Sequence, residues 1–164
     1  MITNFYIHSQ TGNTLAAANT LFGIARDTGG TAELAVIVPS SEQETDPAKI
    51  TISPVPDCSG ADLIVIGGPV HGASATAAVR KAISEMTGMK DKPVVLFVTE
   101  FFPFAWMGGS RAVKQMEEAA AARGAKIVCK EIIHWKRRDR QKQLDAFADA
   151  FRSVLAAGGS VPHI

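Results

Sequence analysis

The sequence has few cysteines, almost no net charge and no long apolar run. Its two cysteines, Cys58 and Cys129, form no CxxC pair, so we expect neither an iron–sulfur cluster nor a thiol-redox motif. With a net charge of +1, the chain lacks the excess of basic residues that is typical of a dedicated nucleic-acid binder. Apolar runs such as Val94–Val98 are far shorter than the roughly 20 residues that a membrane span needs.

The first residues, Met1–Phe5, contain no basic region and no long apolar segment, so we expect no signal peptide. Two lone thiols suit a reducing cytoplasm, although a disulfide between them stays open. The chain of 164 residues is 46% hydrophobic and 20% charged, which is typical of one globular domain. We predict a cytoplasmic domain over residues 1–157, a short tail over 158–164, and no metal site.

Several motifs of nucleotide-binding and catalytic proteins are absent. The sequence contains no G-x4-G-K-[ST] and no G-x-S-x-G, which excludes a P-loop hydrolase and a nucleophile elbow. Residues 7–10 lack the acidic side chains of a phosphoacceptor receiver domain. Neither cysteine opens a Cys-x5-Arg loop, which argues against a low-molecular-weight phosphatase.

The chain alternates apolar segments with amphipathic ones. We predict strands at 5–7, 34–38, 63–66, 93–98 and 127–133, and helices at 15–25, 75–86, 110–123 and 139–155. The proline-punctuated stretch 39–60 is predicted to be mostly loop, with an extended piece at 50–52. Strands that are apolar on both faces indicate a parallel sheet covered by helices on each side. The predicted fold class is therefore α/β, a three-layer doubly wound sandwich with a five-stranded parallel sheet of order 2-1-3-4-5.

Ligands of such sheets bind beyond the C-terminal ends of the strands. The loop after the first predicted strand places three hydroxyls, a glycine and an asparagine before a helix, whose free N–H groups attract anions. This pattern predicts a phosphate site, with a plain helix cap as the alternative. The candidate residues are Ser9, Gln10, Thr11, Gly12, Asn13 and Thr14.

Residues 9–14 resemble the S/T-x-T-G-N-T phosphate loop of flavodoxins, which bind flavin mononucleotide (FMN). The order of elements resembles that family over nearly the whole chain. The resemblance implies a flavodoxin-like fold, FMN as the cofactor, and electron transfer through the flavin.

The segment after the third predicted strand resembles the G-x-P-V-Y-G segment of that family. It does not fit a dinucleotide G-x-G-x-x-G motif, because the spacing is wrong and the loop follows the third strand. The resemblance implies that one side of the flavin ring is flanked by Gly68, Pro69, Val70, His71 and Gly72. Gly67 and Gly68 would let the backbone approach a flat ligand. Gly72 matches the glycine of that family whose peptide group can form a hydrogen bond with flavin N5. His71 replaces an aromatic residue and could stack or supply a proton near N5; the alternative is a histidine that only faces solvent.

The loop after the fourth predicted strand contains four aromatic residues within 101–106. By the same resemblance, the other side of the ring would be flanked by Thr99, Glu100, Phe101 and Trp106. Flavodoxins usually carry an acidic residue and a tyrosine here. A hydrophobic plug and a homodimer contact are the alternatives, because exposed aromatic clusters often mark interfaces.

Two features bear on partners. Residues 136–140 form a basic run that could dock an acidic redox protein or the 2′-phosphate of NADPH, or be a solvated helix start. His8 could pair with phosphate or simply pack at the end of its strand.

The first hypothesis is an FMN-binding carrier with a redox protein partner. The alternative is an NAD(P)H-dependent oxidoreductase acting on quinones or other small acceptors, which the near-zero net charge favours because carriers are typically acidic. A non-redox interaction module is the third.

Overall fold

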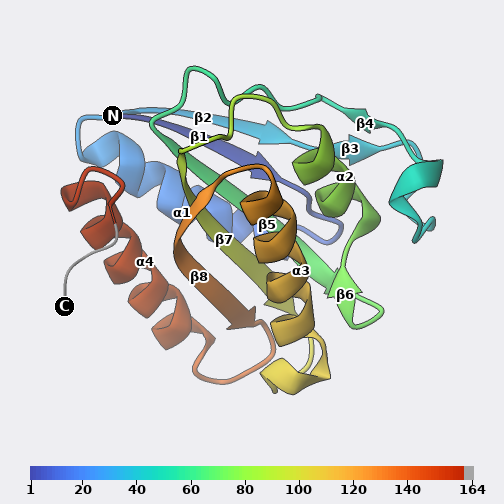
Figure 1. Cartoon of the computed structure of the whole chain (residues 1–164). Helices are drawn as coiled ribbons and strands as arrows, with labels where there is room; N and C mark the ends of the chain where they lie inside the picture. Colours follow the sequence, from blue (N-terminus) through green and yellow to red (C-terminus); the bar gives the residue numbers. More distant parts are fainter. Residues whose placement is uncertain (161–164) are drawn as a thin grey trace.

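Five parallel strands form the central sheet of the protein (Figure 1). The computed structural model describes residues 1–160. The strands are β1 (Ile2–Ile7), β2 (Thr31–Val36), β5 (Leu63–His71), β7 (Pro93–Glu100) and β8 (Lys126–His134). They lie in the order β2-β1-β5-β7-β8, which confirms the predicted order 2-1-3-4-5.

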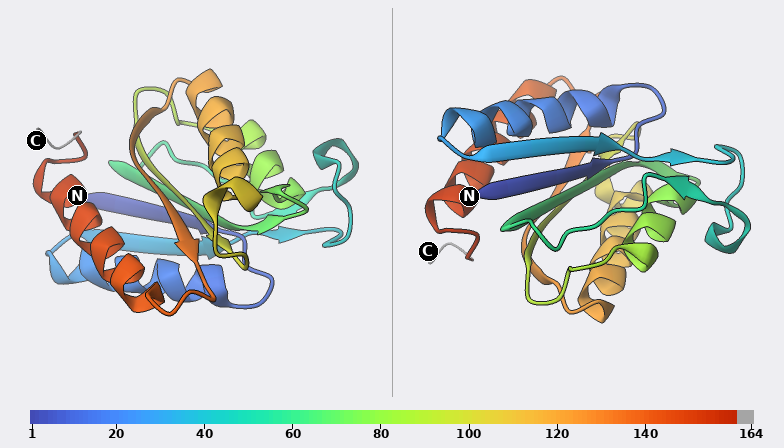
Figure 2. Two further views of the ribbon diagram at one scale, coloured as in Figure 1. Left: turned by 90° about the horizontal axis from the view of Figure 1, so that it is seen from below. Right: turned by 90° about the horizontal axis from the view of Figure 1, so that it is seen from above.

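Helices cover both faces of the sheet, as the three-layer prediction requires (Figure 2). The helices are α1 (Asn13–Asp27), α2 (Ala77–Glu85), α3 (Gly109–Ala122) and α4 (Arg140–Ala156). One face carries α1 and α4, and the other carries α2 and α3. Large aromatic side chains fill the layer under α1 and α4, where Phe97 packs on Phe147 and Phe5 packs on Phe151. Alanine, valine, isoleucine and methionine side chains dominate the opposite layer.

The second strand begins and ends earlier than the prediction at 34–38. Thr31 of β2 lies opposite Ile2 of β1, and the pairing ends at Val36. Val38–Pro39 (β3) then pairs antiparallel with Ile52–Ser53 (β4), outside the main sheet. The rest of 39–60 is loop apart from a short 3-10 helix, η1 (Pro47–Lys49), which confirms the loop prediction.

The third strand is longer than predicted, and its end at Gly67–Pro69 is a prediction that the structure corrects. β5 continues to His71, so Gly68, Pro69, Val70 and His71 lie in a strand rather than in a loop. The pairing of β1 with β5 ends at Gly67. Pro69 therefore has no residue of β1 opposite it, and its missing N–H group costs no hydrogen bond to that strand. Residues 74–75 form β6 (Ser74–Ala75), which folds back antiparallel on β5.

The remaining boundaries differ from the predictions by a few residues. β6 delays the start of α2 to Ala77, and Thr76 caps that helix by accepting from the Val79 N–H. β7 runs through Thr99 and Glu100, so the aromatic loop begins at Phe101. Part of the predicted tail, residues 161–164, lies outside the described residues. Among residues 1–160, no helix is long and apolar enough to cross a membrane.

Candidate functional site

The first candidate loop connects β1 to α1 at the C-terminal edge of the sheet. Gly12 is the N-cap residue of α1, with a φ of 88° that favours glycine. The N–H groups of Asn13 and Thr14 lie in the first turn of α1 and so have no intrahelical acceptor, and Gly12 has no side chain that could cap them. Thr11 is exposed beside them, and Ser9 Oγ accepts from the Leu15 N–H at 3.3 Å. The loop therefore offers N–H and hydroxyl donors to an anion.

Thr14 is placed differently from its neighbours. Its side chain is buried, and its hydroxyl lies 2.7 Å from that of Thr99 at the end of β7. Two predicted site residues, 85 positions apart in the chain, are thus joined by one hydrogen bond. This bond fixes the start of α1 against the end of β7.

The second candidate segment is the hairpin formed by β5 and β6. Gly72 and Ala73 form its two-residue turn, with φ values of 56° and 58°. The hairpin rests on the start of α3, where a Cβ on Gly108 would lie 2.8 Å from the Ala73 Cα atom. Only glycine allows this approach, so Gly108 joins the hairpin to the end of the aromatic loop.

A cavity of about 290 Å³ opens beside the hairpin, against the N-terminus of α2 and residues 41–45. Three predicted site residues line it, namely Gln10, His71 and Gly72. His8 also borders it: its Nδ1 lies 2.8 Å from Thr76 Oγ1, and its Nε2 lies 2.9 Å from Glu42 Oε2. The structure therefore places His8 as a packed strand-end residue that ties the 39–60 segment to α2.

The aromatic loop, residues 101–106, lies at the ends of β7 and β8. Its four rings are 50–79% exposed, which rules out the alternative of a buried hydrophobic plug. Phe104 and Trp106 stack with their ring planes 8° apart, and Phe101 and Phe102 meet edge to face. Phe101 and Trp106 are therefore exposed at this edge of the sheet, and their place beside a flavin ring stays a prediction.

Glu100 does not share that exposure. Its side chain is 1% exposed, and its Oε1 lies 2.7 Å from His134 Nδ1 at the end of β8. The same nitrogen lies 3.2 Å from the Phe102 carbonyl oxygen. Burial raises the pKa of Glu100, and His134 and the Gly109 N–H partly offset that rise. The Glu100 carboxylate is therefore buried beneath the aromatic loop and is not presented at the surface.

This burial predicts a pH-dependent contribution to stability. The raised pKa means that the folded protein holds the Glu100 proton more tightly than the unfolded chain, so stability falls as pH rises from 4.5 through the folded pKa. Glu100→Gln cannot ionise, and we expect its free energy of unfolding to fall less than that of the unchanged protein between pH 4 and pH 7. Urea unfolding at each pH measures the difference.

Glu118→Gln is the matched control for this prediction, because Glu118 is exposed on α3. The control should follow the pH profile of the unchanged protein. Parallel profiles for Glu100→Gln and the unchanged protein would contradict the raised pKa of the buried Glu100 carboxyl group.

The sequence prediction did not include His134 among the site residues. The sequence carries only a weak signal for His134, because its place depends on strand register. Glu100 lies opposite His134 in the β7–β8 pair. A β-bulge shifts that register between Val94 and Val95, where Ile127 and then Cys129 become the partners. Without the bulge, Ile133 would face Glu100, and no pattern in the sequence reveals that extra residue.

No family model matches the sequence, and no curated protein matches it. Similar solved structures include the two-electron reduced flavodoxin of Megasphaera elsdenii, with 18% identity, a TM-score of 0.63, and coverage of 92% of this chain and 98% of that one.

Two further structures extend the likeness. The oxidised flavodoxin 2 of Bacillus cereus is 16% identical, with a TM-score of 0.64 over 93% of this chain and 98% of that one. A flavoprotein of Lactobacillus acidophilus, solved in complex with FMN, is 19% identical, with a TM-score of 0.58 and coverage of 86% of this chain and 97% of that one. The strand order, the helix layers and these likenesses agree: the chain has a flavodoxin-like α/β fold.

Proposed function

We propose that this chain binds FMN and transfers electrons through it. The observation that carries the proposal is the β1–α1 loop, where an αL glycine occupies the N-cap position of a helix whose first N–H groups point to the C-terminal edge of the sheet. Two structurally similar proteins are flavodoxins, and a third was solved with FMN. Both cysteines are free thiols, which suits the reducing cytoplasm that we propose for it.

The residues present fit a phosphate of FMN. The loop supplies hydroxyl, amide and backbone N–H donors without a lysine or arginine, and the positive end of the α1 dipole favours the negative charge. Thr11 and Asn13 are the side chains that we assign to it. Ser9 and Thr14 hold the loop in place through Leu15 and Thr99.

The ring would be flanked by the hairpin of residues 70–75 and by the aromatic loop. When bound, FMN supplies the redox chemistry, because it accepts and releases electrons. The residues of this chain would supply the stacking surfaces, Phe101 and Trp106, and an exposed imidazole, His71.

Anaerobic titration with FMN tests the proposal, with flavin fluorescence as the readout. We expect quenching on binding, and weaker binding of riboflavin because it lacks the phosphate. NADPH is then added to the FMN-loaded protein without oxygen.

The outcomes separate the hypotheses. Binding of FMN without a reaction with NADPH supports a carrier that takes electrons from a protein donor. Rapid bleaching by NADPH would instead support an NAD(P)H-dependent oxidoreductase. If FMN does not bind, the proposed function is refuted, and only the assignment of the fold still holds.

A further inference from the structure

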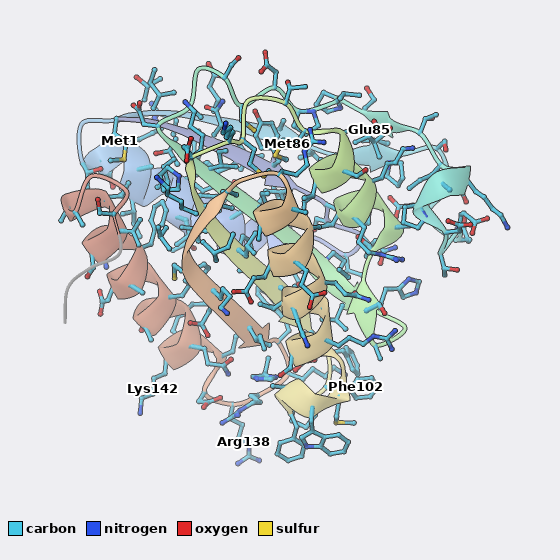
Figure 3. All side chains as sticks on the ribbon, in the orientation of Figure 1. Met1, Glu85, Met86, Phe102, Arg138 and Lys142 are labelled. Carbon is cyan, nitrogen blue, oxygen red and sulfur yellow. The ribbon has the colours of Figure 1, made fainter. Side chains whose placement is uncertain are left out.

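The aromatic loop lies beside a cluster of cations at the ends of β7 and β8. Residues 134–142 contain five basic side chains and one acidic one. We call residues 136–140 the basic turn, and the aromatic loop with the basic turn the rim. Figure 3 shows Phe102 and Arg138 at the same end of the molecule. Lys136 Nζ lies 3.9 Å from the centre of the Phe101 ring, which joins the two parts of the rim directly.

Local contacts hold the basic turn in shape. Arg137 forms a two-point ion pair with Asp139, at 3.0 and 2.8 Å. Arg140 stacks over Trp135 and donates to its carbonyl oxygen at 2.9 Å. Within residues 1–160, no carboxylate lies in ion-pair range of Lys136 or Arg138. The turn therefore presents unneutralised positive charge in a fixed conformation.

Four half-exposed rings with cations around them match the composition of protein interfaces, which are enriched in aromatic residues and arginine at their centres. The sign of the charge identifies the partner. A second copy of this chain would bring the same cations together across a twofold axis, where they repel. An acidic surface on a partner would instead be attracted by each of these cations.

From these contacts we propose that the rim is the docking surface for an acidic redox protein. This proposal rests on the proposed function, because it places the partner where its redox centre approaches the flavin. In the transfer, the partner's centre is oxidised by one electron and the flavin is reduced by one. Attraction between unlike charges would speed the encounter, as in other electrostatically steered pairs.

Isothermal titration calorimetry tests the docking surface with oxidised plant-type [2Fe–2S] ferredoxin, a strongly acidic redox protein, as the probe. We expect binding by the FMN-loaded protein that weakens about tenfold between 50 and 300 mM salt. The double variant Lys136→Glu/Arg138→Glu should weaken it by about tenfold or more, because two attractions become repulsions.

The matched control is Lys49→Glu/Lys90→Glu, which makes the same change in net charge at two exposed lysines away from the rim. It should change the affinity by less than about twofold. Equal losses in the two double variants would show general charge attraction and overturn the assignment of the rim. Absence of ferredoxin binding would overturn it too, as would binding of phosphatidylserine vesicles in place of ferredoxin.

A third variant tests the apolar half of the rim. Phe104→Ser removes one ring of the stacked pair, and it should weaken ferredoxin binding equally at low and high salt. The same titrations on FMN-free protein separate this proposal from the proposed function. Loss of FMN binding with retained docking refutes only the cofactor assignment, whereas FMN binding without docking refutes only the rim.

Discussion

Replacing Gly67 by alanine is expected to lower the free energy of unfolding by about 3 kcal/mol, at the upper end of the usual cost of overpacking a core. A Cβ on Gly67 would lie 2.3 Å from two ring carbons of Phe97. Phe97 is fully buried and packs on Phe147 at 5.4 Å between ring centres, so the ring has little space to retreat. Thermal and urea unfolding measure the loss, and we expect Tm to fall by roughly 6–12 °C.

Gly23→Ala is the matched control, because Gly23 lies inside α1 with no atom within 4 Å of its added Cβ. Alanine is the better helix former, so this change should raise stability by up to about 1 kcal/mol. Gly67→Ala/Phe97→Leu should recover part of the loss, since the smaller side chain relieves the clash. A Gly67→Ala protein as stable as the unchanged one would contradict this account.

The second large effect concerns the β1–α1 loop, where Thr11→Ala/Asn13→Ala should weaken FMN binding by at least about 100-fold. Hydrogen bonds to charged groups contribute about 1.5–3 kcal/mol each, and 100-fold corresponds to about 2.8 kcal/mol. The affinity for riboflavin should be unchanged, because it has no phosphate. Fluorescence titration with both flavins measures the two affinities.

Asn19→Ala/Thr20→Ala supplies a control with the same two residue types, both exposed on α1. It should bind FMN like the unchanged protein. Unchanged FMN affinity in Thr11→Ala/Asn13→Ala would refute the phosphate assignment. An equal loss of riboflavin affinity would show that the loop contacts the ring instead.

The sequence alone was enough to predict the fold class and the edge of the sheet at which the candidate loops gather. Strands such as Leu63–Ile66 and Val94–Val98 are apolar on both faces, and only a sheet with helices on both sides buries both. Because parallel strands end at one edge, the loops that follow them had to lie near each other. Local patterns of this kind depend on neighbouring residues, which is why they could be predicted.

The roles of Gly67 and Gly68 required the tertiary structure. In the sequence they suggested a turn and a backbone that approaches a flat ligand. In the fold they are strand residues, and a Cβ would meet Phe97 on one face and Val79 on the other, at 2.3 and 2.4 Å. Those partners come from β7 and α2, and no local pattern indicates which side chains fill that space.

The same reason explains Glu100. The sequence placed it in a loop, whereas β7 extends two residues further than predicted and buries its carboxylate beside His134. That pairing depends on a one-residue bulge in β8, and so does the position of the basic turn that follows His134. The sequence determined which residues end each strand, and the strand register, set by long-range packing, decided which of them face one another.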